Sequence, residues 1–245
     1  RYGKGLVLKN EQPENIVEEM ISLWKTLGGN ELPVEKSKIL FVGEEISFAS
    51  RYRVEHFREQ LILNGYASKF IQMDQAEQEK IEEYTAVVMY RCSKLMEAEM
   101  LADRAKAAKI PVYYDVDDLV FDYEKISGLH FLKGSEYSDF RTTTDRIHGC
   151  MEFCDGYFTS TETLAEEIRE EFPGKPVVIN RNCMSMEMEV LSHEAVEQTD
   201  KDKDRIYIGY LSGSKTHDQD FVQVEAALLE VMERHPEVYL KLVGV

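Results

Sequence analysis

The feature that most constrains the fold of this chain is a regular alternation of short β-rich runs with amphipathic helical stretches. The run KILFVG at 38–43 is apolar throughout, which is typical of a strand buried on both faces. Val54, Phe57 and Leu61 then recur at helical spacing in the stretch that follows. Further strands are predicted at 67–73, 86–90, 110–116, 156–160 and 175–180. This alternation predicts an α/β fold, a Rossmann-like, doubly wound parallel sheet with crossover helices.

For the helix after the fifth predicted strand, the sequence predicts both the buried face and the N-terminus. Leu164, Ile168 and Phe172 fall on one face of it at helical spacing. Thr159 and Glu162 have the spacing of a capping box, so we expect them at its start.

The alternation breaks once and then resumes. Residues 184–204 are acidic and then densely charged, which indicates a linker. A new β-α-β pattern follows, and Val224, Leu228 and Val231 are expected to face inward from its helix. The predicted organisation is a helical extension or remnant of a preceding domain at 1–36, a Rossmann-like domain at 37–183, a linker at 184–204 and the start of a second Rossmann-like domain at 205–245. Both ends appear cut in this pattern, so we expect the chain to be a piece of a longer polypeptide.

Composition excludes several classes of partner. The formal net charge of −17 argues against a nucleic-acid backbone or an anionic membrane surface as the main partner. No apolar run approaches the roughly 20 residues that span a bilayer, and no signal peptide is visible. The cysteines lack the paired spacing of a zinc site and are expected to be buried thiols in a reducing cytoplasm: Cys92, Cys150, Cys154 and Cys183.

The stretch KIPVYYDVDDLVFD carries a predicted strand directly into four aspartates, Asp115, Asp117, Asp118 and Asp122. Residues that follow strands of a doubly wound sheet lie at its carboxyl edge, where such sheets bind ligands. One interpretation is structural: the aspartates cap the next segment and pair with nearby arginines. Another is a metal-free carboxylate cluster on the wall of a binding cleft.

Two metal-dependent chemistries also use aspartates at a strand end. A haloacid-dehalogenase-type phosphatase has Asp-x-Asp-x-Thr with Mg²⁺ between carboxylates; Asp115 and Asp117 match, but Leu119 stands where a hydroxyl is needed. A single-domain metal-dependent sugar transferase uses Asp-x-Asp to hold a divalent cation against the donor diphosphate. That fold lacks a second Rossmann-like unit, which counts against it here. Both metal-dependent chemistries are kept as alternatives to the metal-free cluster.

Cations at two other predicted strand ends are candidate ligands for anions. Arg51 and Arg53 lie between the first strand and its helix, where backbone amides and a guanidinium fork favour phosphate or carboxylate. They are also compatible with a solvated helix start. After the first strand of the second domain, small residues would let a ligand approach the backbone, and two cations can meet a diphosphate. These residues are Gly209, Gly213, Ser214, Lys215 and His217.

Together these segments resemble the group-1 family of glycosyltransferases with the two-Rossmann (GT-B) architecture, in a bacterial branch acting in polysaccharide assembly. The resemblance is carried by SRYRVEHFREQL, IPVYYDVDDLVFD, DGYFTSTETLAEEI, KPVVINRN, IGYLSGSKTHDQDF and HPEVYLKLVG, and it spans about 38–245.

The resemblance implies transfer of a sugar from a nucleotide-sugar donor to a saccharide or glycolipid acceptor in the cytoplasm, with no cofactor and no obligatory metal. It places the acceptor on the first domain and the donor on the second. Lys215 is similar to the lysine of the family's donor phosphate loop and Gly209 to its leading glycine, but the arginine that commonly follows is Tyr210 here. Asp117 takes the place of a histidine near the reacting sugar, so the resemblance implies Asp117 and Asp118 as catalytic carboxylates.

The family's donor-binding glutamate pair would lie beyond Val245. We therefore expect the chain as given to bind donor weakly and to be inactive. A non-catalytic sugar- or nucleotide-binding module is the remaining alternative.

Overall fold

The computed structural model describes residues 36–44, 48–127, 135–198, 204–211 and 218–243. The helix expected within 1–36 lies outside these residues. The chain divides into two compact units at 192/193, which falls inside one helix. Each unit is described by itself.

The first unit contains a six-stranded, wholly parallel sheet, which confirms the α/β prediction. Its strand order is β2-β1-β3-β4-β5-β6. The strands are β1 (Lys36–Gly43), β2 (Tyr66–Gln72), β3 (Ala86–Tyr90), β4 (Val112–Val116), β5 (Gly156–Thr159) and β6 (Val177–Ile179). Each lies where an apolar run in the sequence predicts a strand.

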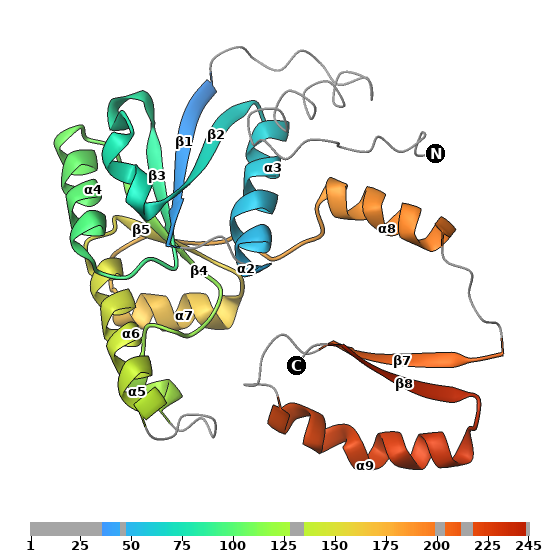
Figure 1. Ribbon diagram of the computed structural model, residues 1–245. Helices are drawn as coiled ribbons and strands as arrows, with labels where there is room; N and C mark the ends of the chain where they lie inside the picture. The colour runs from blue at the N-terminus through green and yellow to red at the C-terminus, as the bar shows by residue number, and fades with distance from the viewer. Residues whose placement is uncertain (1–35, 45–47, 128–134, 199–203, 212–217, 244–245) are drawn as a thin grey trace. The chain divides into compact units, whose positions relative to one another are not determined.

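Helices cover both faces of this sheet, as Figure 1 shows for α3 and α4 on opposite sides. The helical segments of the unit are α2 (Phe48–Ser50), a π-helical turn η1 (Arg51–Glu55), α3 (His56–Leu63), the 3-10 turns η2 (Met73–Gln78) and η3 (Ile81–Glu83), α4 (Met96–Ala107), α5 (Tyr123–Ile126), α6 (Ser135–Glu152), α7 (Glu162–Glu171) and the start of α8 (Met186–Gln198). Alternate strand residues feed two cores. Leu40 and Val42 of β1 pack with α4, α6 and α7, whereas Phe41 packs with Val54 and Phe57.

The strand order sets where a ligand of this sheet would bind. From β1 the chain crosses to β2 on one side, and it then returns to β3 on the other side of β1. Such a reversal is a topological switch point, and ligands of open α/β sheets bind outside the carboxyl ends of the strands that flank it. The residues directly after β1 and β3, with those after the adjacent β4, define the region of interest.

Two local predictions are corrected. The segment 184–204 is not irregular throughout, because α8 occupies Met186–Gln198. The amide of Met188 donates to Ser185 Oγ at 3.1 Å, so a local side chain caps this helix despite its acidic composition. At the start of α7 the cap is Thr161, whose side chain accepts from the Leu164 amide at 3.2 Å. Thr159, the expected cap, is instead a buried residue of β5.

The C-terminus of α4 holds Lys109 in the left-handed conformation, with φ of 59°. The Lys109 amide donates to the Lys106 carbonyl at 3.0 Å, and the Ile110 amide donates to the Ala105 carbonyl at 2.9 Å. This is the Schellman pattern. The position that Lys109 occupies in it is usually a glycine, because a residue with a Cβ is strained in the left-handed conformation.

We expect Lys109→Gly to raise the free energy of unfolding by about 0.5–1 kcal/mol, because it removes this strain. Lys106→Gly, inside the last turn of the same helix, is the matched control and should lower it by about 1 kcal/mol. Urea unfolding of both variants checks the prediction, and destabilisation by Lys109→Gly would contradict it.

The second unit is a β-α-β element, as predicted. Its strands β7 (Ile206–Leu211) and β8 (Val238–Val243) pair in parallel, and α9 (Asp218–Arg234) connects them. The prediction that Val224 and Val231 face inward is wrong, since they are 43% and 39% exposed. Leu228 is partly buried, as predicted, and the other partly buried residues among the described side chains of α9 are Phe221 and Met232.

Candidate functional site

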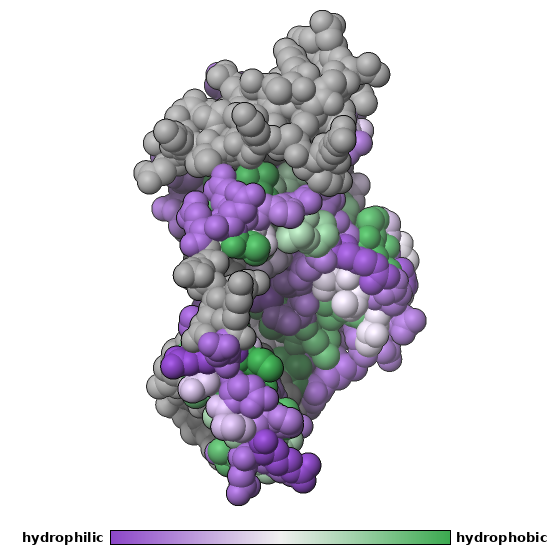
Figure 2. Space-filling model, turned by 90° about the vertical axis from the view of Figure 1, so that its right-hand side faces the viewer, coloured by the Kyte–Doolittle hydropathy of each residue, from purple (hydrophilic) through white to green (hydrophobic). Residues whose placement is uncertain are grey.

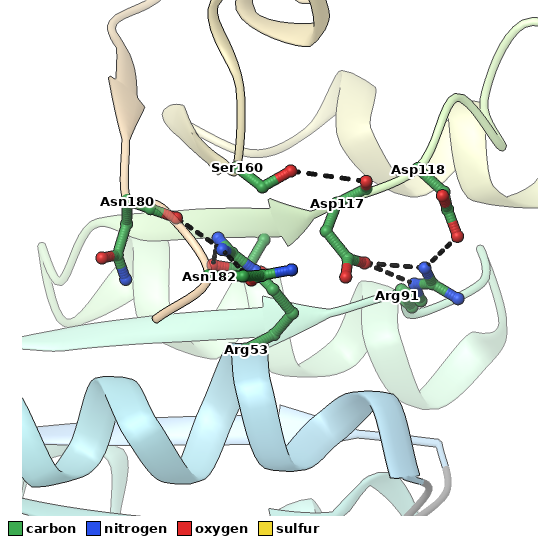
Figure 3. A network of polar contacts seen from close by, with 8 residues as sticks. Arg53, Arg91, Asp117, Asp118, Ser160, Asn180 and Asn182 are labelled. Carbon is green, nitrogen blue, oxygen red and sulfur yellow. Dashed lines mark hydrogen bonds and ion pairs between the residues drawn. The ribbon is translucent and has the colours of Figure 1, made fainter. Parts of the chain in front are cut away.

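A polar cluster lies at the carboxyl edge of the first unit's sheet, beside the switch point. Glu44 follows β1, Arg91 follows β3, Asp117 and Asp118 follow β4, and Ser160 follows β5. Figure 3 shows the Arg91 side chain reaching both Asp117 and Asp118. Four segments of the chain thus meet at one edge, as the parallel topology requires.

Arg91 is the centre of this cluster. Its Nε and Nη2 donate to Asp117 Oδ1 at 3.1 and 2.7 Å, and Nη2 also donates to Asp118 Oδ2. Its backbone has φ of 46°, a left-handed conformation that non-glycine residues rarely adopt outside special sites. Burial would lower the pKa of Arg91, but the carboxylates of Asp117 and Asp118 raise it well above its usual range. The guanidinium is therefore a permanent cation within this cluster.

The two carboxylates differ in their access to solvent. The Asp117 side chain is 13% exposed and that of Asp118 is 63% exposed. The Asp117 carbonyl also accepts from Ser160 Oγ at 3.4 Å. Asp117 is thus held on two sides, whereas Asp118 presents most of its carboxylate to solvent.

Glu44 completes the edge beside Arg91. Its carboxylate accepts from the Ser93 amide and from Ser93 Oγ, the latter at 3.3 Å. No motif in the sequence singles out Glu44 or Arg91. The one available signal is that each directly follows a predicted strand.

Beneath this cluster, Arg53 and Asp115 form a buried ion pair. Arg53 Nε and Nη2 donate to Asp115 Oδ1 and Oδ2, each at 2.8 Å, and the two side chains are 0% and 1% exposed. Arg53 Nη1 donates to the Asn180 carbonyl and, at 2.9 Å, to Asn182 Oδ1. Figure 3 shows Arg53 extending toward Asn180 and Asn182. The π-helical turn η1 carries this arginine into the interior.

This pair corrects the expectation that Arg53 and Asp115 bind acceptor or phosphate. Both Asp115 oxygens are occupied by the guanidinium, and neither side chain reaches solvent. Asp115 therefore lacks the access that a phosphatase nucleophile needs. The same burial prevents it from joining Asp117 in an Asp-x-Asp metal site.

The other predicted cation and the fourth aspartate have simpler surroundings. Arg51 is exposed at the start of η1. Asp122 caps α5, accepting from the Lys125 amide at 3.2 Å. Three of the four aspartates thus pair with arginines and one caps a helix, which are the contacts that the structural interpretation predicts.

Burial gives the buried pair a pH dependence. The effect of burial on the Asp115 carboxyl group is larger than the opposing effect of the Arg53 charge. Burial therefore raises the pKa of Asp115 from 3.8 to about 6. Between these values the native state binds more protons than the unfolded state, so stability should fall as pH rises from about 4 to about 6.

Each pKa unit corresponds to roughly 1.4 kcal/mol. We expect Asp115→Asn to remove this part of the slope. Urea unfolding of the wild type and the variant from pH 4 to 7 measures the difference, and identical slopes would contradict the assignment.

Most of the predicted donor-binding residues cannot be placed. Gly213, Ser214, Lys215 and His217 lie outside the described residues. Gly209 lies within β7 and pairs with Lys241. A Cβ at Gly209 would come within 3.3 Å of Leu211 Cδ1, the end of a flexible side chain, so packing among the described residues does not demand glycine there.

Three of the four cysteines lie in the core of the first unit. Cys92, Cys150 and Cys154 are buried free thiols, as predicted, whereas Cys183 is exposed. In the described part of the chain, no three His, Cys, Asp or Glu side chains are grouped so that they could hold a metal ion.

Among the described residues, no helix is long and apolar enough to cross a membrane. Figure 2 shows a mainly hydrophilic surface with small apolar patches on the side that it draws.

Comparison with known proteins found no matching family model and no significant match among curated proteins.

Proposed function

We propose that this protein is a GT-B glycosyltransferase. Such an enzyme transfers a sugar from a nucleotide-sugar to an acceptor hydroxyl, here in polysaccharide or glycoconjugate synthesis. The observation that carries the proposal is the Arg91–Asp117–Asp118 cluster at the carboxyl edge of a doubly wound parallel sheet. A second parallel β-α-β unit in the same chain supports it. The order of the family-like segments along the sequence is the remaining support.

The chemistry assigns different roles to the two carboxylates. In the reaction the bond between the anomeric carbon and the diphosphate oxygen breaks, and the acceptor oxygen bonds to that carbon. The acceptor hydroxyl loses its proton, and the nucleoside diphosphate leaves. Asp117 is the candidate base for that proton. Asp118, which is mostly exposed, is suited to accept hydrogen bonds from sugar hydroxyls.

Stabilisation of the leaving diphosphate is an electrostatic task. Arg91 does not serve it in this proposal, because two carboxylates already pair with its charge. We assign the task to Lys215 and His217, with Gly209, Gly213 and Ser214 allowing the backbone to approach the phosphates. Arg51, which is exposed, is a further cation that could assist.

The test is a transfer assay on the natural polypeptide in full, with a panel of UDP-, GDP- and ADP-sugars and neutral saccharide or glycolipid acceptors. Acceptor-dependent release of nucleoside diphosphate, with a product heavier by one sugar, is the expected result. Turnover that persists in EDTA would separate this reaction from Asp-x-Asp chemistry. Hydrolysis of a chromogenic phosphate ester without transfer would favour a phosphatase.

A second candidate function is a non-catalytic sugar- or nucleotide-binding module. It is favoured by one observation: every aspartate of the 115–122 stretch has a structural partner. Saturable binding of a nucleotide-sugar without transfer to any acceptor in the panel would support this module over the enzyme.

A further inference from the structure

Side chains of η1 and α3 hold much of the segment after β6, residues 180–186, which is also bonded to β5 through the Asn180 amide and to α7 through the Arg181 side chain. This segment, called the exit segment below, has no helix or strand of its own before α8 begins at Met186. It leads the chain from the sheet into α8, within which the first unit ends. The position of its backbone therefore depends in large part on contacts with side chains from other elements.

One face of the η1–α3 helix supplies these contacts. His56 Nδ1 donates to the Cys183 carbonyl at 2.8 Å. The Glu59 carboxylate accepts from the Met186 amide through both oxygens, each at 3.1 Å, and so also caps α8. Gln60 Nε2 lies 3.3 Å from Cys183 Sγ.

The contacts of His56 fix both its tautomer and the orientation of its ring. A carbonyl can only accept, so the proton of the neutral ring lies on Nδ1. The ring is 3% exposed, and its Nε2 has no hydrogen-bond partner among the described residues. Its edge-to-face contact with Tyr52, with ring centroids 5.0 Å apart, fixes its orientation.

Arg53 differs from the other residues of this face because it has two sets of partners. Through Nη1 it holds Asn180 and Asn182 of the exit segment. Through Nε and Nη2 it holds Asp115 of β4. Asp115 is two residues before Asp117, and its carbonyl accepts from the Arg91 amide at 3.2 Å.

We propose that Arg53 is a positioning residue that couples the carboxyl end of β4, and with it the Arg91–Asp117 cluster, to the exit segment and the first turn of α8. A planar guanidinium with fixed donor directions cannot follow one set of partners without moving against the other. A shift of β4 at Asp115 is therefore transmitted to residues 180–186. The coupling does not depend on the reaction that the protein performs.

The test measures amide hydrogen exchange in a variant that does not touch the exit segment. Asp115→Asn keeps the shape of the side chain but loses the charge that orients Arg53. We expect the amides of Asn180 and Met186 to exchange roughly ten-fold faster, comparable to losing a hydrogen bond to a charged group. In the wild type these amides donate to the Thr159 carbonyl and to Glu59.

Matched controls separate coupling from general loosening. Asp155→Asn alters a carboxylate that accepts from the Val112 amide at the other end of β4, and it should leave both amides unchanged. Glu59→Gln should speed exchange at Met186 directly. If Asp115→Asn changes neither amide while Glu59→Gln does, the coupling is wrong. Equal acceleration throughout β1 and β3 would also contradict it, because it would reflect only lost global stability.

A reciprocal variant keeps the proposal testable if Asp115→Asn does not fold. Asn182 is exposed, so Asn182→Ala should be tolerated. Coupling is reciprocal, so this change should speed exchange of the Arg91 amide several-fold. An unchanged Arg91 amide would overturn the proposal.

Discussion

Replacing Arg53 by methionine is expected to lower the free energy of unfolding by about 3–5 kcal/mol, the usual cost of breaking a buried ion pair by removing one partner. The change leaves Asp115 without a counter-charge and removes the donor that serves Asn180 and Asn182. Since domains are stable by only about 5–15 kcal/mol, this loss is a large share of the total. Urea unfolding at pH 7 measures it.

Arg58→Met is the matched control on the same helical stretch. Arg58 is 5% exposed and also donates to Ser68 Oγ at 3.2 Å, but its charged partner Glu55 has a side chain that is 44% exposed and can be hydrated when left alone. We expect a loss of about 1 kcal/mol. The double change Arg53→Met with Asp115→Leu should recover much of the loss, because no buried charge is then unpaired. A loss below about 1 kcal/mol for Arg53→Met would mean that the pair is not the anchor that its geometry indicates.

For the proposed sugar transfer, replacing Asp117 by asparagine in the natural polypeptide in full is expected to lower kcat by about 10²–10⁴-fold, the range that general-base catalysis supplies. KM for the acceptor should change much less, because asparagine keeps the shape and can still accept from Arg91. Asp118→Asn should instead raise KM, because Asp118 is proposed to bind sugar hydroxyls. Initial rates over a range of acceptor concentrations separate the two effects.

Two further variants define what the Asp117 result means. Glu124→Gln alters an exposed acid outside the cluster and should leave both constants unchanged. Arg91→Gly removes the guanidinium and the strain of its left-handed backbone. If Asp117 acts only by orienting Arg91, Arg91→Gly should match the loss from Asp117→Asn. Full activity of Asp117→Asn would rule out Asp117 as the base.

The sequence predicted the strands well and the contacts of their polar ends poorly. β3 lies at 86–90, as its apolar run indicated, because a strand buried on both faces must be apolar at every position. Arg53 shows the opposite case. Arginine at a helix start suggested an anion site, but the π-helical turn directs this side chain inward to Asp115, 62 residues away in the sequence. No local pattern identifies a partner at that separation.

α8 shows a second limit of composition. Its acidic sequence indicated a linker, and by local propensity alone a helix of 13 residues is marginal in water. Glu59, 127 residues earlier in the chain, caps its first amide, that of Met186. Long-range capping of this kind is visible only in the folded chain.

By itself, the sequence determined the class of fold and the edge at which polar residues gather, because parallel strands align their carboxyl ends. Only the tertiary structure decided which of those residues face solvent. It buried Asp115 against Arg53 and left Asp118 open, although only two residues lie between the two aspartates. The physical reason is that Asp115 is a residue of β4 on the face covered by η1, where Arg53 supplies a buried counter-charge, whereas Asp118 lies beyond the end of β4, where its carboxylate pairs with Arg91 and stays exposed.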